Sequence, residues 1–181
     1  MKKKERKELQ ALFDKHGLTD LAWIDPKDIV VAHWVRMKCM YGCRHYGRNA
    51  SCPPNTLDVA DCRRFFDEYR VGVIFHFEKA LDKPEDRHAW SKEVNEDLVS
   101  LEREVFIAGY PKAFLLFMDS CWLCGECAGK REECQNPRQA RPTPEGMAVD
   151  VFSTVRLYGF PLEVLSEYSQ TMNRYAFLLV E

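Results

Sequence analysis

Residues Asp119 to Pro144 read D-S-C-W-L-C-G-E-C-A-G-K-R-E-E-C-Q-N-P-R-Q-A-R-P-T-P and contain four of the eight cysteines in the chain. Cys121, Cys124 and Cys127 lie at two consecutive C-x-x-C steps, and Cys134 follows after six more residues. Two-residue gaps let the backbone wrap so that successive sulfurs point at one centre. Three close cysteines and a more distant fourth are the arrangement that a [4Fe–4S] cluster needs. We therefore predict a metal centre here, with iron–sulfur favoured.

Other interpretations of this stretch are weaker. Zinc also takes four thiolates, but commonly as two C-x-x-C pairs held apart by a longer loop, whereas these ligands are grouped three and one. A redox dithiol of Cys121 and Cys124 would leave the other two cysteines unexplained. The polar neighbours of the cysteines, such as Lys130 and Glu132, disfavour a set of buried core thiols. The last gap is six residues rather than the three of ferredoxins, so zinc stays open as the alternative.

A second group of cysteines lies in Cys39–Pro54, which reads C-M-Y-G-C-R-H-Y-G-R-N-A-S-C-P-P. Its glycines and double proline indicate a loop. The gaps of three and eight residues between Cys39, Cys43 and Cys52 match no zinc knuckle, and a radical-SAM motif would need a cysteine where Tyr46 stands. We expect these three cysteines to hold a second metal centre close to the first.

This second centre has only three local thiolates, so its fourth site must be filled from elsewhere or left open. Cys62 is one candidate, but it shares a helical apolar stripe with Val59, Phe66 and Tyr69, which favours a core position. His45 and water are the other options. An open iron site would have chemical consequences, because it could bind a substrate as a Lewis acid.

The whole chain has 181 residues, of which 46% are hydrophobic and 30% charged, as expected for one globular domain over residues 1–181. A net charge of −2 argues against a nucleic-acid partner. No apolar segment of a signal peptide follows the basic Met1–Arg6 stretch, and no apolar run approaches membrane-spanning length. We therefore expect a cytoplasmic protein whose eight cysteines are reduced and serve mainly as ligands.

Hydrophobic periodicity predicts helices and strands in alternation. An amphipathic helix is expected over residues 3–16, within an N-terminal segment 1–17, and Asp82–Glu85 has the features of a helix start. The expected helices after the first are 57–69, the long one after residue 85 to about 108, a turn from 143 and 149–158. The expected strands are 29–36, 71–77, 113–118, 160–165 and 174–180.

This order predicts an α/β domain with a largely parallel central sheet. If the strands at 29–36, 71–77 and 113–118 are parallel, both cysteine loops leave the C-terminal ends of strands. They would then share the edge of the sheet at which open α/β folds place their sites.

With both cysteine loops in view, the chain resembles a family of uncharacterised predicted metal-binding proteins, a domain of unknown function found mainly in anaerobic bacteria and archaea. The resemblance spans roughly residues 30–180 and rests on the motifs C-x3-C-x2-YG-x4-CPP and C-x2-C-x2-C-x6-C. Further matching residues are Pro137, Arg141, Pro142, Glu145, Gly146 and Asp150. The Cys62 position is not part of the pattern. The resemblance implies metal binding without an established reaction.

Three kinds of function fit these features. The first is an iron–sulfur protein with one or two [4Fe–4S] clusters, transferring electrons to a redox partner protein or reductively activating a partner enzyme. The second is an interaction module stapled by zinc or a cluster, and the third is an enzyme that uses an open cluster iron. The sequence contains no Walker loop and no dinucleotide glycine fingerprint, and we assign no catalytic residue.

Overall fold

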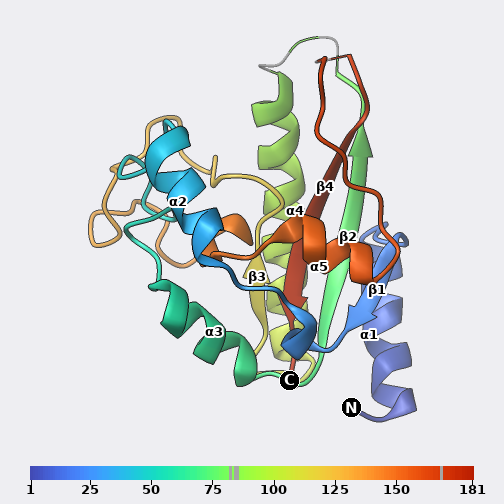
Figure 1. The fold of residues 1–181 in the computed structure, drawn as a ribbon. Helices are drawn as coiled ribbons and strands as arrows, with labels where there is room; N and C mark the ends of the chain where they lie inside the picture. The colour runs from blue at the N-terminus through green and yellow to red at the C-terminus, as the bar shows by residue number, and fades with distance from the viewer. Residues whose placement is uncertain (82, 84–85, 168) are drawn as a thin grey trace.

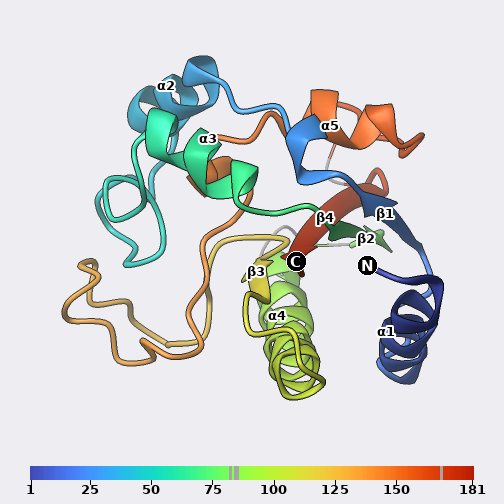
Figure 2. The same cartoon turned by 90° about the horizontal axis from the view of Figure 1, so that it is seen from below.

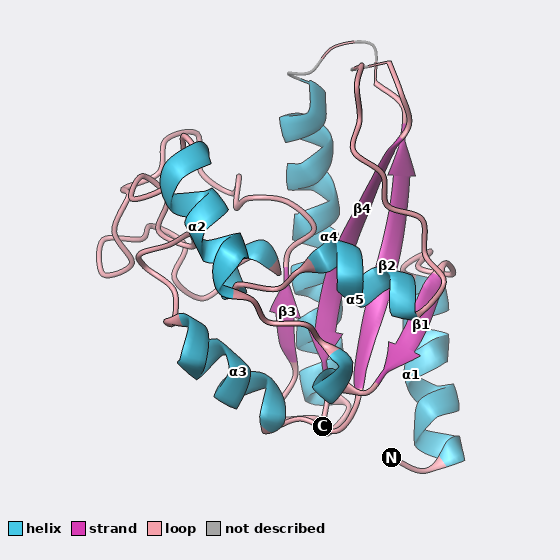
Figure 3. Ribbon diagram, in the orientation of Figure 1, coloured by secondary structure: helices cyan, strands magenta, loops and turns pink. Residues whose placement is uncertain are grey.

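A four-stranded antiparallel sheet in the order β1-β2-β4-β3 forms the centre of the computed structural model, which describes residues 1–181 except 82, 84, 85 and 168 (Figure 1). The strands are β1 (Leu21–Ile24), β2 (Gly72–Lys79), β3 (Phe114–Leu116) and β4 (Met172–Leu179). The α-helices are α1 (Lys3–Lys15), α2 (His33–Gly42), α3 (Val59–Asp67), α4 (Asp86–Ile107) and α5 (Val151–Leu157), and the 3-10 turns are η1 (Pro26–Asp28) and η2 (Glu145–Met147). Figure 3 distinguishes the three kinds of segment.

The prediction of a largely parallel sheet is wrong. The last strand, β4, lies between β2 and β3 and pairs antiparallel with both, with Phe177 opposite Ile74 on one side and Leu116 on the other. Because β2 and β3 each run against β4, they run in the same direction as one another. The α4 crossover between them is therefore present, but the two strands that it joins are not neighbours.

Helices cover both faces of the sheet, because side chains along each strand alternate between the faces. Val73, Phe75 and Leu178 pack with the apolar sides of α1 and α4 in one core cluster. Ile74 and Phe177 pack in a second cluster, on the face of α3 and α5. Figure 2 shows the two groups of helices on opposite sides of the strands. The molecule therefore has three layers, with a buried sheet in the middle.

Most of the predicted elements are present, but two of the strands are not. The expected strand 29–36 is extended only at its start: Val31 forms an isolated bridge with Val149, and α2 begins at His33. Residues 160–165 form no strand, whereas β1 was not predicted. The expected start of α4 at Asp82–Glu85 falls largely outside the described residues. Within the described part of the chain, no helix is both long and apolar enough to span a lipid bilayer.

The first cysteine loop also begins at a different kind of element from the one predicted. The prediction that both cysteine loops leave the C-terminal ends of strands is wrong for this loop, because Cys39 lies in α2 and Cys43 is its C-cap residue. The second loop does follow a strand, β3, from which the chain continues through Met118. One loop is thus placed by a helix that packs near η2, and the other by the short edge strand.

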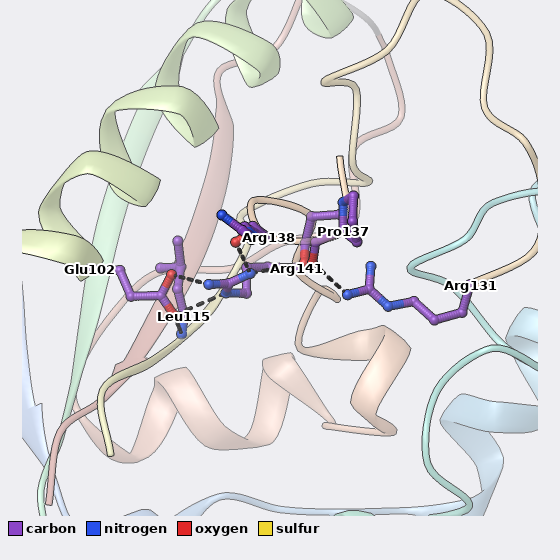
Figure 4. Close-up of polar contacts among 7 residues, drawn as sticks. Glu102, Leu115, Arg131, Pro137, Arg138 and Arg141 are labelled. Carbon is purple, nitrogen blue, oxygen red and sulfur yellow. Dashed lines mark hydrogen bonds and ion pairs between the residues drawn. The ribbon is translucent and has the colours of Figure 1, made fainter. Parts of the chain in front are cut away.

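A buried ion pair fixes the point at which the second loop returns to the body of the protein (Figure 4). Glu102 of α4 is 5% exposed and accepts hydrogen bonds from the Leu115 N–H (2.9 Å) and from Nε of Arg141 (2.9 Å). Nη2 of Arg141 lies 2.7 Å from the other carboxylate oxygen. One side chain therefore joins α4, β3 and the segment that follows the loop.

We expect Glu102→Ala to lower the free energy of unfolding by about 3 kcal/mol, because it leaves Arg141 and the Leu115 N–H without a buried partner. Equilibrium unfolding in urea measures this loss. The matched control is Glu96→Ala, which removes an exposed pair with Lys92 on the same helix and should change stability by less than about 0.5 kcal/mol. Equal effects of the two substitutions would contradict the anchoring role.

Candidate metal centre

The second cysteine loop is closed at its base by a hydrogen bond from the Phe117 N–H to the Pro142 carbonyl (2.9 Å) and consists of turns and bends in between. Cys121, Cys124 and Cys134 are half-buried, and Cys127 is exposed. Burial raises the pKa of Cys121, and the charges of Cys124 and Cys134 raise it further, so these three sulfurs are close enough to interact. Cys121, Cys124 and Cys134 thus lie near one another, and Cys127 lies on the exposed part of the same loop.

The first cysteine set is gathered in the same way around the end of α2. Cys39 is half-buried, Cys43 is exposed, and Cys52 is buried. The Cys43 N–H donates to the Cys39 carbonyl (3.3 Å) in the last turn of the helix. Burial raises the pKa of Cys52 to about 12, with further increases from the charges of Cys43, Cys39 and, less strongly, Cys121. Cys52 is thus the point at which the two sets approach one another.

Asparagine side chains and backbone amides join the two loops. Nδ2 of Asn49 donates to the Cys121 carbonyl (3.2 Å), and Nδ2 of Asn55 donates to the Gly129 carbonyl (2.8 Å). The Ala50 N–H donates to Sγ of Cys127 (3.3 Å). Within the second loop, Nδ2 of Asn136 donates to Sγ of Cys124 (3.0 Å). The sequence reasoning missed these asparagines, although asparagine beside cysteine in turn-rich segments is a recognisable signal.

The side chains present fit a thiophilic metal centre in chemistry but are not arranged as a finished one. All eight cysteines are free thiols. Among the described residues, no three His, Cys, Asp or Glu side chains converge closely enough to hold a metal ion as they stand. Soft thiolates suit zinc and iron–sulfur clusters, and sites of this kind are completed by binding, since the metal offsets the repulsion between thiolates.

An aromatic cluster connects both loops to α4. The ring centres of His88 and Trp122 lie 3.9 Å apart, and His45 meets Trp122 edge to face at 5.4 Å. Burial lowers the pKa of both histidines, with neighbouring arginines adding to the effect, which favours the neutral imidazole that binds metals. Sequence reasoning considered His45 but missed His88, because a histidine within a helix far along the chain from either loop gives no signal.

Cys62 lies apart from these groups. It is 0% exposed, belongs to the core cluster on the α3 face, and donates through Sγ to the Leu57 carbonyl (3.5 Å). The interpretation of Cys62 as a core residue is confirmed. The other seven cysteines are all in, or next to, the two loops.

A family model described as predicted metal-binding protein (DUF2284) matches residues 22–180. The chain belongs to the DUF2284 family. The matched range includes both cysteine loops, and the resemblance to a family of predicted metal-binding proteins is confirmed. The DUF2284 description gives metal binding as a prediction for the family and names neither a metal nor a reaction. Comparison with curated proteins and with solved structures gives no significant match.

We expect Cys62 in the folded, metal-free, reduced protein to react with iodoacetamide on the order of a hundredfold more slowly than Cys43 and Cys127 at pH 8. Burial blocks access and raises the pKa of Cys62 to about 11, which depletes the reactive thiolate. Because the pKa of Cys62 lies above pH 9, the rate at which Cys62 is alkylated should rise as the pH is raised from about 7 to 9. Peptide mass spectrometry measures each site, and equal rates for Cys62 and Cys43 would contradict the core placement.

Proposed function

We propose that this DUF2284 protein binds a [4Fe–4S] cluster through Cys121, Cys124, Cys127 and Cys134 and donates electrons to a partner protein or reductively activates a partner enzyme. The observation that carries the proposal is the packing of this four-thiol loop against a second loop of three thiols. The bound cluster would supply one-electron redox chemistry. The protein itself supplies the thiolates, their hydrogen bonds and the loop that follows the edge strand β3.

The donors around the sulfurs favour iron–sulfur over zinc. The Ala50 N–H and the Asn136 amide each donate to a cysteine sulfur, and such bonds set the potential of an iron–sulfur cluster. A structural zinc site would need only four of the seven thiolates in the loops. Three cysteines beside a complete set of four are better explained by a second centre.

Cys39, Cys43 and Cys52 are proposed to hold that second centre. Cys52 adjoins the second loop, where the Ser120 side chain hydrogen-bonds to it and lowers its pKa, against the larger opposite effect of burial. Cys62 is excluded as the fourth ligand by its place in the core cluster. His45, which lies in the same loop, or an exogenous molecule would complete the set.

The exposed side of α2 supports a partner protein in this proposal. Trp34 is 49% exposed and Tyr41 is 79% exposed, and Met37 lies between them on the helix that carries Cys39. Aromatic residues and methionine are enriched in interfaces between proteins. This surface equally suits the second candidate function, an interaction module stapled by zinc or a cluster. The free thiols fit the reducing cytoplasm in either case.

Metal analysis of anaerobically purified variants tests the cluster assignment. We expect the wild type to absorb near 400 nm and Cys124→Ser to lose about four iron atoms per chain, because one cluster loses a ligand. Cys43→Ser should reduce iron while leaving the other cluster in place.

The control for metal content is Cys62→Ala, which removes a thiol outside both loops and should keep the full iron and sulfide content. A colourless wild type with about one zinc per chain would contradict the iron–sulfur assignment and support the stapled module. Unchanged iron in Cys124→Ser would contradict the assignment of the 121–134 ligands.

The electron-transfer part of the proposal predicts that the dithionite-reduced protein, freed of excess reductant, reduces an oxidised viologen dye under anaerobic conditions. About one electron per cluster should be recovered, measured by the absorbance of the dye radical. Iron-depleted protein treated in the same way is the control. An iron-loaded protein that transfers no electrons to a series of dyes would rule out the redox role.

A further inference from the structure

A cavity of about 760 Å³ lies between α2, α5 and the first half of β4, whose positions can be followed in Figure 1. Its volume falls in the range of sites that bind small molecules. Cys39 and Cys43 line one side, and residues 172–175 line the other. The pairing of β3 with β4 begins only at Phe177, so the described strands leave the first half of β4 unpaired on the side of β3. The cavity thus adjoins a free sheet edge and the first cysteine set.

Positive charge exceeds negative charge in the lining. The cations are Lys38, Arg44, Arg87 and Arg174, and the carboxylates are Glu145 and Glu163. Arg87 pairs with Asp119 (2.9 Å), and Glu163 pairs with Arg156 (3.6 Å). Among the described residues, no ion pair involves the remaining three cations, and Glu145 is the one lining carboxylate left without an ion pair. An anionic ligand would balance this excess.

Arg174 is the strongest anchor for such a ligand. Its Nε is buried and has no hydrogen-bond partner among the described residues, and its Nη2 has only the weak acceptor Sδ of Met172 at 3.9 Å. A buried guanidinium nitrogen without a partner is costly, and the cost is removed when an acceptor binds. The planar fork of arginine matches a carboxylate through two parallel hydrogen bonds.

Apolar side chains form much of the remaining wall. Phe152 of α5, Leu162 after it, and Met172 of β4 line the cavity together with Met118 and Trp34. A cavity that combines a few fixed charges with an apolar wall selects a molecule with an anionic end and an apolar body.

We propose that this cavity binds a small organic carboxylate, with the carboxylate on Arg174 and the apolar part against Phe152 and Leu162. The ligand would lie beside Cys39 and Cys43. Its binding rests on the cavity alone, whereas its position next to a metal centre rests on the proposed function. A carboxylate bound beside a centre of three thiolates would add a ligand-binding role to the electron transfer proposed above.

Methionine methyl groups provide the test. The measurement is the NMR chemical shift of each methyl group in protein labelled with ¹³C-methyl methionine. Met118 and Met172 line the cavity, and Met147, which does not line it, is the internal control. The probes are phenylacetate, 3-phenylpropionate and hexanoate, each paired with its uncharged amide, at up to about 20 mM. We expect at least one carboxylate to shift the Met118 and Met172 signals, and its amide to bind about tenfold more weakly or worse.

Two substitutions test whether Arg174 is the residue that binds the carboxylate. Arg174→Gln should weaken carboxylate binding at least about tenfold, whereas Arg103→Gln, at an exposed position on α4 outside the cavity, should leave it unchanged. The comparison of each acid with its amide uses the wild type, so it stands even if Arg174→Gln does not fold.

Several outcomes would overturn this inference. They are the absence of any shift with all three acids, equal affinity for acid and amide, and stronger binding of phenyl phosphate than of any carboxylate. Iron content is measured on the same samples. Selective carboxylate binding by a protein that contains no iron would contradict the proposed cluster and support the ligand site. An iron-loaded protein that binds no carboxylate would contradict the ligand site and leave the proposed cluster standing.

Discussion

The pairing of β4 with two partners is the constraint on which the rest of the structure depends. This strand bonds to β2 along its whole length and to β3 at its end, and its alternating side chains enter both core clusters. Without it, β2 and β3 would have no common neighbour, and the helices on either face would have no continuous surface to cover. The pairing of β3 with β4 also holds the strand from which the second cysteine loop begins, next to the ion pair of Glu102 and Arg141.

The sequence predicts local structure well and the sheet poorly. The long α4 and the buried β2 follow from the apolar residues that each segment contains, which are a property of that segment alone. The order of strands is a property of pairs, and nothing within 71–77 or 113–118 indicates that the last strand lies between them. The prediction of a strand over 29–36 is wrong for a related reason. Val31 bridges to Val149, but the residues from His33 onward become a helix packed near η2.

The candidate site shows the same division. The cysteines could be recognised as candidate ligands because the spacing within each set is a local feature of the sequence. Their approach to one another depends on bonds between segments far apart, such as Asn49 to the Cys121 carbonyl and Asn55 to the Gly129 carbonyl. His88 and Arg174 come from α4 and β4, far in sequence from either loop, so only the folded arrangement reveals them. Residues of this kind carry no motif.

The position of β4 in the chain also bears on how the protein matures. Both cysteine loops precede β4, so during translation their thiols leave the ribosome before the strand that holds β3 in place has been made. Contacts between β2 and β4 join residues about a hundred positions apart, and such non-local pairing forms late. Nascent loops are therefore exposed, flexible thiol ligands for a period in which the body of the domain is incomplete. If these loops bind metal as proposed, a chain that captured metal at this stage would carry a preassembled loop into its final fold.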